Sequence, residues 1–268
     1  MKKTGGTLGL LQFENLGRIP NLVHFVTTRS GGVSLPPYDS LNLGLHTADN
    51  SANVLGNRAL LAKETGMGQE KFLYASQEHS GDVKIIDSTA VENGVLSLNP
   101  LTDATVTALP GICLMVMVAD CVPVLLFDPV KKVSAVIHAG WRGTVHKITS
   151  NTIRAMIGHF GCDPADILAG IGPSIGPCCY EVGEDVTEFV ANSFGTTEGY
   201  LIRKNKSSKP YFDLWYANQK QLTDNGVKPG NIETSALCTM CNSETFFSSR
   251  ASGGITGRFA AGICILQV

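Results

Sequence analysis

The chain has 268 residues, of which 43% are hydrophobic and 16% are charged, and its formal net charge is −2. A composition this apolar and this close to neutral excludes wholesale disorder, and a pI near 6.3 gives no electrostatic footprint for binding nucleic acid. The longest apolar run, residues 112–119, is too short to span a membrane, and glycines followed by Glu14 interrupt any signal-peptide core, so we expect a cytoplasmic protein without membrane contacts.

The first half of the chain carries one predicted helix and three predicted strands. The helix covers residues 53–65 and ends at Gly66, a residue type that commonly terminates helices. The continuous apolar run 112–119 predicts a strand that is buried on both faces. Two shorter strands are predicted over residues 124–127 and 133–137.

The second half alternates predicted helices with glycine-rich loops. Apolar periodicity predicts helices over residues 144–160, 182–194 and 216–225, followed by a terminal strand over 259–268. The sequence shows neither an internal repeat nor a low-complexity tract that would divide the chain. We therefore expect a single domain over residues 1–268, present as a monomer or a small homo-oligomer.

The three central strands predict a neighbouring pair of reactive residues. If these strands form a meander, the chain reverses twice, so the first and third strands point the same way. Cys121 leaves the first strand and His138 leaves the third. The two side chains are therefore predicted to meet at one end of the sheet.

His79 joins this pair as a candidate metal ligand. Two imidazoles and a thiolate are ligand types that zinc prefers, and three protein ligands leave a fourth position open for chemistry. The long separations between His79, Cys121 and His138 are unlike a compact structural zinc finger and indicate a catalytic ion. The alternative is a set of hydrogen-bonded histidines beside a buried cysteine that packs as a small apolar residue.

The segment after His138 has features of an anion site. Residues 140–143, Gly-Trp-Arg-Gly, lead into the helix predicted over 144–160, and a helix N-terminus offers free N–H groups to a phosphate. Arg142 adds a guanidinium that matches phosphate or carboxylate. The alternative is an exposed arginine at an ordinary helix cap.

Four more cysteines leave a different interpretation open. The chain has eight cysteines, and without a secretory signal we expect them to be reduced. Cys178 and Cys179 form one pair, and Cys238 and Cys241 form a CxxC pair. Together they would supply four thiolates, as in a non-enzymatic binding module stabilised by zinc.

Six segments in this order resemble one protein family. They are TTRSGGVS at 27–34, LNLG at 41–44, ADCVPVLL at 119–126, IHAGWRGT at 137–144, GPSIGPCCYEVG at 172–183, and FFSSR with TGR between 246 and 258. Together they resemble the YfiH-type family, also called the multicopper polyphenol oxidase or laccase-domain family. The resemblance implies an α+β fold of packed mixed β-sheets with helices on the outside, in a YfiH-like (cysteine-hydrolase-like) architecture.

The resemblance also implies an activity and a set of site residues. It implies a zinc-dependent purine nucleoside phosphorylase that converts adenosine, inosine, guanosine or methylthioadenosine plus phosphate to base and ribose-1-phosphate, and that also deaminates adenosine. The implied metal ligands and catalytic residues are His79, Cys121 and His138. The residues that match substrate or phosphate contacts are Arg29, Asn42, Arg142, Tyr180 and Arg250. The sequence departs from the family pattern at Ser249 and Ala251, beside Arg250.

Two other enzyme classes compete with the phosphorylase. A copper-dependent polyphenol oxidase of the laccase type requires His-x-His pairs for its copper cluster, and the six histidines of this chain form none. A one-copper oxidase needs only two histidines and a cysteine, so copper stays the alternative to zinc. A cysteine hydrolase would use Cys121 as nucleophile, with His138 or His79 as its base. The HxE…PCxxC signature of zinc nucleobase deaminases is absent, so any deaminase activity belongs to another lineage.

Overall fold

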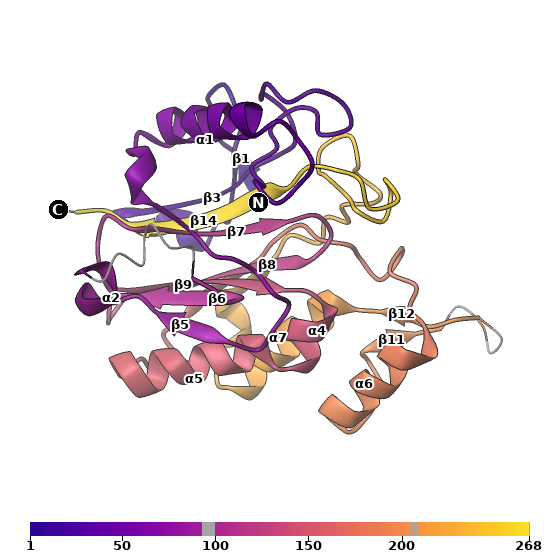
Figure 1. Ribbon diagram of the computed structural model, residues 1–268. Helices are drawn as coiled ribbons and strands as arrows, with labels where there is room; N and C mark the ends of the chain where they lie inside the picture. Colours follow the sequence, from indigo (N-terminus) through magenta and orange to yellow (C-terminus); the bar gives the residue numbers. More distant parts are fainter. Residues whose placement is uncertain (93–99, 204, 206–207, 268) are drawn as a thin grey trace.

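Two β-sheets stacked face to face form the centre of the protein (Figure 1). A computed structural model describes residues 1–92, 100–203, 205 and 208–267. The first sheet has the strand order β1-β2-β3-β14-β7-β4, and the second has the order β13-β10-β8-β9-β6-β5. The bounds of these strands are β1 Lys2–Lys3, β2 Leu11–Gln12, β3 Leu22–Val26, β4 Phe72–Tyr74, β5 Val83–Ile85, β6 Ala104–Thr107, β7 Cys113–Val118, β8 Val122–Asp128, β9 Val133–Ala139, β10 Leu168–Ile171, β13 Ile232–Thr234 and β14 Phe259–Ile265. A small hairpin pairs β11 (Leu201–Ile202) with β12 (Tyr211–Phe212).

Helices cover the outer faces of both sheets. Figure 1 shows α1 over the first sheet, and α4, α5 and α7 against the second. The helix bounds are α1 Ser51–Thr65, α2 Ser88–Glu92, α4 Trp141–Val145, α5 Ile148–Phe160, α6 Glu184–Phe194 and α7 Leu214–Asp224, with short 3-10 turns at Leu16–Arg18, Gln69–Lys71 and Pro229–Asn231. This arrangement confirms the expected α+β fold of packed mixed sheets with helices outside. Among the described residues, each helix is too short or too polar to cross a bilayer.

The strands at the centre of each sheet are buried on both faces. Along β7, Leu114, Val116 and Val118 pack into the cluster between the sheets, whereas Met115 and Met117 pack towards α1. Strands β8, β9 and β14 are likewise buried along their whole length. Because successive strand residues point to opposite faces, burial on both sides demands the unbroken apolar run seen in the sequence.

Most predicted elements are confirmed with shifts of a few residues at their ends. The helix predicted over 53–65 is α1, which ends at Gly66 with φ of 69°. The helix predicted over 182–194 begins at residue 184, and the helix predicted over 216–225 begins at 214, because the Asp213 side chain caps it. The terminal strand ends at Ile265, and Val268 lies outside the described residues.

The prediction of one helix over 144–160 is wrong, because the chain forms α4 and α5 with a break between them. Lys147 has φ of 60°, in the left-handed region that interrupts a helix. Polar side chains of α7 bond at the break: Gln221 donates to the Thr144 carbonyl, and Thr149 donates to Asn218. Packing against α7 therefore breaks the helix, although the apolar periodicity over residues 144–160 predicts one continuous helix.

The predicted meander is also wrong. Strand β7 pairs with β14 and β4 in the first sheet, whereas β8 pairs with β9 and β10 in the second. The chain passes from one sheet to the other at residues 119–121. Cys121 and His138 still meet, because antiparallel pairing puts Pro123 at the start of β8 opposite His138 at the end of β9.

Candidate active site and metal centre

Three segments bring His79, Cys121 and His138 together, and we call this group the His–Cys–His centre. His79 lies in the loop between β4 and β5, Cys121 in the crossing from β7 to β8, and His138 in β9. The Cys121 Sγ atom lies 3.8 Å from His79 Nε2, and the two imidazole rings meet edge to face with centroids 4.8 Å apart. All three ligand atoms lie within 4.8 Å of one another.

Asp103 orients both histidines. It directly precedes β6, whose register with β9 puts it beside His138, and its Oδ1 lies 2.7 Å from His138 Nδ1. This contact leaves Nε2 of His138 free to bind a metal. The carboxylate of Asp103 also accepts the backbone N–H groups of His79 and Ser80, at 3.0 and 2.7 Å. These bonds hold the loop in which His79 has a left-handed φ of 61°.

Gly140 allows the three side chains to approach. A Cβ atom built on Gly140 would lie 2.9 Å from His79 Cδ2 and 3.0 Å from Cys121 Sγ. Such contacts are too short for a side chain, so residue 140 must be glycine for His79 and Cys121 to keep these positions.

The local charges favour a thiolate at Cys121. Burial opposes ionisation of Cys121, but His138, with hydrogen bonds from both histidines, outweighs burial and lowers the pKa of Cys121 to about 6. Burial lowers the pKa of His138, yet Cys121 and Asp103 outweigh it and raise that pKa to about 9. Burial raises the pKa of Asp103, but hydrogen bonds from His138 and Ser80 lower it to about 2.

The donor set of the His–Cys–His centre fits a metal ion. Ligands bound at 2.0–2.3 Å with tetrahedral angles lie about 3.5 Å apart, close to the observed separation of Cys121 Sγ and His79 Nε2. The Asp103 contact fixes one histidine in the orientation that metal sites use. One side of the centre faces a cleft, which provides room for a further ligand.

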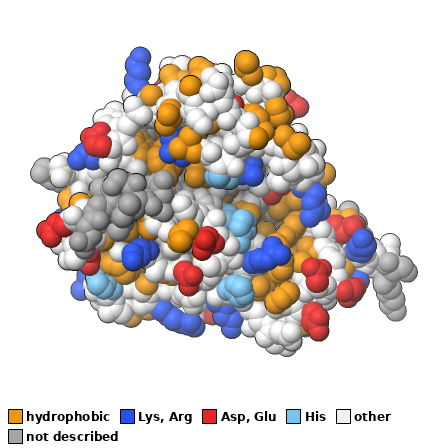
Figure 2. Space-filling model, viewed as in Figure 1, with side chains coloured by type: hydrophobic (Ala, Val, Ile, Leu, Met, Phe, Trp, Pro, Cys, Tyr) orange, Lys and Arg blue, Asp and Glu red, His pale blue; other side chains and the backbone are white. Residues whose placement is uncertain are grey.

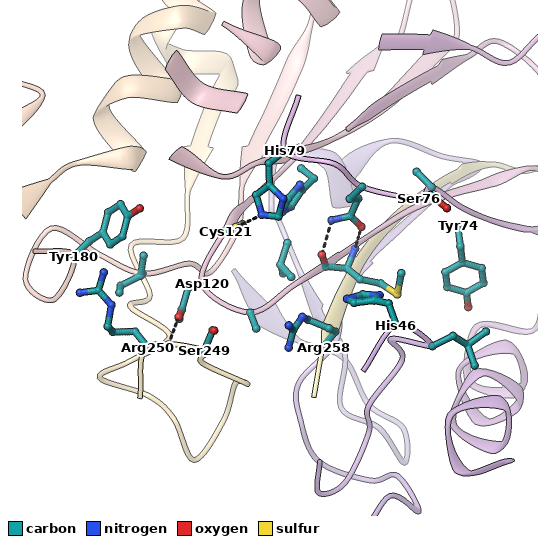
Figure 3. Close-up of a pocket in the computed structure, with 18 of the residues that line it drawn as sticks. His46, Tyr74, Ser76, His79, Asp120, Cys121, Tyr180, Ser249, Arg250 and Arg258 are labelled. Atoms are coloured by element: carbon teal, nitrogen blue, oxygen red, sulfur yellow. Dashed lines mark hydrogen bonds between the residues drawn. The ribbon is translucent and has the colours of Figure 1, made fainter. Parts of the chain in front are cut away.

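The cleft beside the centre has a volume of about 760 Å³. Figure 2 shows histidine and cationic side chains around a hollow on this face. In the close-up of Figure 3, Tyr180 and Arg250 lie on one side of His79, and Arg258, His46 and Tyr74 lie on the other. The cleft therefore offers cations and aromatic rings at both ends.

Two of the predicted substrate residues line this cleft. The Arg250 guanidinium lies 5.3 Å from the centre of the Tyr180 ring and donates to the Glu181 carbonyl. Its backbone N–H donates to Asp120 Oδ2 at 2.7 Å. Burial raises the pKa of the Tyr180 phenol, so Tyr180 carries its proton near neutral pH and can donate a hydrogen bond.

The structure places the three other predicted substrate residues outside the lining of the cleft. Asn42 is fully buried, and its side-chain oxygen accepts the backbone N–H of Arg258, so it holds a cleft residue in place. Arg29 pairs with Asp39 at a second, smaller hollow. Arg142 is exposed and stacks on Trp141, with its carbon Cζ 4.3 Å from the ring centre.

Sequence reasoning missed several residues of the site. Arg58 donates to the Leu43 carbonyl and lies over the Tyr74 ring, with its Cζ 3.6 Å from the ring centre. The sequence offered one indication for Asp103, because it is a carboxylate directly before a strand. Its importance becomes evident once that strand is seen to pair with β9. For Arg58 there was no such indication, because a single arginine within a helix is usually predicted to be exposed to solvent.

Fold and site together define an α+β protein in which two histidines and a cysteine, a donor set that could hold a metal ion, line a substrate-sized cleft. The sequence model of the family described as multi-copper polyphenol oxidoreductase laccase matches residues 23–266. The chain belongs to this family, as its motifs predict, and it is an enzyme.

Individual relatives match nearly the whole chain. A purine nucleoside phosphorylase of Bacteroides thetaiotaomicron is 37% identical over 260 residues, covering 96% of each chain. A protein named adenosine deaminase RL5, from an unidentified prokaryote, is 35% identical and covers 89% of this chain and 92% of its own. The crystal structure of YlmD from Geobacillus stearothermophilus superposes with a TM-score of 0.90 at 31% identity, covering 99% of each chain.

Proposed function

We propose that the protein is a zinc-dependent purine nucleoside phosphorylase of broad specificity that also deaminates adenosine. The observation that carries this proposal is the His–Cys–His centre at the base of a cleft lined by arginines and tyrosines. Its volume of about 760 Å³ falls within the range of about 300–1,000 Å³ found for small-molecule sites. Relatives named for phosphorolysis and for adenosine deamination support both activities.

Phosphorolysis requires an anion site and a donor for the departing base. A phosphate oxygen forms a bond to the anomeric carbon of ribose while the bond to the purine nitrogen breaks, and the purine leaves with the electron pair. We assign the phosphate to Arg58 and Arg258, because charge-assisted hydrogen bonds from arginine suit phosphate. Burial lowers the pKa of His46, and the charges of these two arginines lower it further, as expected beside a strongly positive pocket.

The other end of the cleft suits the purine. Tyr180 offers a protonated phenol that donates to a ring nitrogen of the purine. Arg250 packs over the same ring and closes this side of the cleft. Arg142 lies close enough to lower the pKa of Tyr180 slightly against the larger effect of burial, and we propose that it draws anions towards the cleft.

We assign the metal site to His79, Cys121 and His138. A zinc ion held there would supply a Lewis acid, which polarises an electronegative substrate atom or lowers the pKa of water to about 7 for deamination. Zinc fits this donor set and needs nothing more from the chain, whereas a laccase copper cluster needs His-x-His pairs that the sequence lacks. Asp103 keeps the proton of His138 on Nδ1 in this assignment.

The decisive experiment measures metal and products in the same preparation. The purified protein is analysed for zinc and copper, then incubated with inosine and phosphate, and ribose-1-phosphate is quantified. We expect the purified protein to contain zinc. We expect ribose-1-phosphate and hypoxanthine to be released in equal amounts, and ammonia to be released when adenosine is the substrate. Full activity of a protein freed of metal would refute the zinc assignment, and hypoxanthine release without phosphate would refute phosphorolysis.

A variant at the phosphate end separates the two activities. Arg258→Gln removes a cation that we assign to phosphate, and a charged hydrogen bond of about 1.5–3 kcal/mol corresponds to a rise of roughly 10- to 100-fold in the KM for phosphate. Deamination of adenosine uses no phosphate and should change little. Arg154→Gln, which alters an exposed arginine on α5, is the matched control. Equal losses in both activities would contradict the assignment of phosphate to this end.

A second candidate function rests on the same residues. Asp103, His138 and Cys121 are linked in the order of a carboxylate–imidazole–thiolate triad, and the lowered pKa of Cys121 suits a nucleophile despite its burial. Metal binding and nucleophilic attack compete for one thiolate, which separates the two functions. If Cys121→Ala kept zinc at His79 and His138 but lost all turnover, the cysteine hydrolase would be favoured over the metal-dependent phosphorylase.

A further inference from the structure

A second group of sulfur atoms lies outside the His–Cys–His centre. Four thiols from two loops converge with all of their Sγ atoms within 4.8 Å of one another. We call this group the cysteine cluster, and its members are Cys178, Cys179, Cys238 and Cys241. We propose that the cysteine cluster is a structural zinc site in which all four thiolates bind one ion.

The topology of the second sheet brings the two loops together. Strands β10 and β13 are parallel neighbours, so the loops that follow them leave the sheet at the same edge. The loops then bond to each other: the Ser174 N–H donates to the Leu237 carbonyl, and the Thr239 N–H donates to the Ser174 carbonyl. The two cysteine pairs are thereby fixed opposite one another.

The sulfur separations match a tetrahedral site. Cys241 Sγ lies 3.7 Å from Cys178 Sγ and 3.4 Å from Cys179 Sγ. Two sulfurs bound to zinc at about 2.3 Å in a tetrahedron lie about 3.8 Å apart, whereas a disulfide requires about 2.0 Å. The thiols are thus placed for a shared ion without a change in backbone position.

The backbone around Cys238 is arranged to stabilise a thiolate. The Gly176 N–H donates to Cys238 Sγ at 3.3 Å. The backbone N–H of Cys241, within the CxxC pair, donates to the same sulfur. A donor from within the CxxC pair to its first sulfur lowers the electron density on a metal-bound thiolate, which is what four anionic ligands on one dication require.

Glycine at position 176 permits this contact. A Cβ atom there would lie 2.7 Å from the Trp215 ring and 3.2 Å from Cys238 Cβ. The loop bearing Cys178 and Cys179 therefore approaches Cys238 as closely as the backbone allows.

The cysteine cluster adjoins one wall of the catalytic cleft. Tyr180 follows Cys179 directly, and the Ile175 N–H donates to the Asp120 carbonyl. On the other loop, Thr239 donates to Asp120 Oδ1 at 2.6 Å. Both loops thus bond to the residue before Cys121, so an ion between them would fix the wall that carries Tyr180 without touching substrate.

Zinc counting tests the site in the intact protein. The wild-type chain is purified anaerobically without chelators, and zinc is measured per chain together with the intact mass. We expect two zinc ions per chain, one in Cys241→Ser, one in Cys121→Ala, and two in the control Cys162→Ser, whose thiol is buried away from both sites. A single zinc that Cys241→Ser retains would overturn the proposal, and so would an unreduced mass that is lower by two hydrogens from a disulfide within the cysteine cluster.

A measurement on the wild-type chain avoids any loss of folding in variants. Thiols are titrated with an aromatic disulfide reagent before and after zinc is removed by a chelator, and the modified cysteines are mapped by peptide mass. We expect protection of the exposed Cys178 and Cys241 until the chelator is added. Rapid modification of both in the zinc-loaded protein would contradict a metal at this position.

These outcomes are separable from those for the proposed function. If wild type holds one zinc that Cys241→Ser loses and Cys121→Ala keeps, the cysteine cluster is supported and the zinc assignment at the His–Cys–His centre fails. If the pattern is reversed, the cysteine cluster fails and the catalytic zinc stands. Phosphorolysis is measured in each case by its own product.

Discussion

The His–Cys–His centre lies where the two stacked sheets meet, whereas the cysteine cluster lies between two loops at one edge of the second sheet. The first contains two imidazoles and one thiolate and borders a cleft of about 760 Å³. The second contains four cysteine thiols, two of them on exposed residues. Three ligands beside a cavity leave a position for substrate, but four ligands fill the coordination of zinc.

The two groups of side chains are also held in place by different kinds of hydrogen bond. Asp103 holds His138 by a side-chain contact of 2.7 Å and holds the His79 loop by backbone bonds. The cysteine cluster is supported by backbone N–H groups from its own loops. A site that performs chemistry needs orientation from rigid strands and carboxylates, whereas a site that joins loops needs only the loops themselves.

The largest expected effect is at the thiolate of the His–Cys–His centre. Cys121→Ala removes one of three ligands, and we expect both phosphorolysis and deamination to fall by about a thousandfold or more, because the Lewis acid contributes several kcal/mol. One equivalent of zinc should be lost while the cysteine cluster keeps its own. Steady-state assays and metal analysis check this, with Cys162→Ala as control. Wild-type rates in Cys121→Ala would show that the His–Cys–His centre is no more important for catalysis than the cysteine cluster.

A smaller effect is expected at Asp103. Asp103→Asn weakens the contact to His138 and the bonds to the His79 loop, and loss of such a partner typically lowers metal affinity or activity by about 10–100-fold. Zinc affinity is measured by competition with a chromogenic chelator. Asp82→Asn alters an exposed carboxylate near the same loop and should be silent. Unchanged zinc affinity in Asp103→Asn would mean that the strands alone orient the ligands.

The free energy of unfolding should also depend on pH through a residue of the first sheet that belongs to neither the His–Cys–His centre nor the cysteine cluster. His24 in β3 is fully buried, its Nε2 accepts the Phe13 N–H, and burial lowers its pKa from 6.5 to about 4. Below pH 6.5, His24 is protonated in the unfolded chain but stays neutral in the folded chain until the pH approaches 4. The free energy of unfolding therefore falls as the pH drops from 6.5 towards 4. The expected loss at pH 5 is about 2 kcal/mol.

His24→Gln should flatten that part of the pH profile, because glutamine keeps an acceptor but does not titrate. Urea unfolding of the zinc-loaded protein between pH 5 and 7 measures the difference, with the exposed His159→Gln as control. An identical acid slope in wild type and His24→Gln would show that other groups determine it.

The smallest effect on catalysis is expected at the cysteine cluster. Cys241→Ser removes one thiol that does not line the catalytic cleft, so kcat/KM at low temperature should fall by about fivefold or less, or about 1 kcal/mol. The thermal unfolding midpoint should fall, because the loops lose their shared ion. Calorimetry with steady-state assays on the same preparation checks both. A collapse of kcat with an unchanged midpoint would place the cysteine cluster in the chemistry instead.

Sequence patterns predicted the strands and helices better than their connections. The apolar run of β7 follows from burial on both faces, and Gly66 marks the end of α1. The meander failed because an apolar strand carries no signal for which sheet it joins. The break at Lys147 was missed because its cause, the polar side chains of α7, lies some 70 residues further along the chain.

The candidate site divides in the same way. His79, Cys121 and His138 were identified from residue type and motif, and the structure brings them within 4.8 Å. Arg58 and Asp103 were missed, since their importance depends on the helix and the strand that point them at the site. Asn42 matched a substrate residue by motif, but the structure encloses it beneath Arg258.

The sequence by itself determined the family, the buried strands and the residue types of the His–Cys–His centre, because these depend on local residue order and hydrophobic pattern. The tertiary structure alone decided which strands share a sheet, which cations line the cleft, and that two distant cysteine pairs converge. Each of these is a contact between segments far apart in the chain, and such contacts follow from packing energies that no local pattern records.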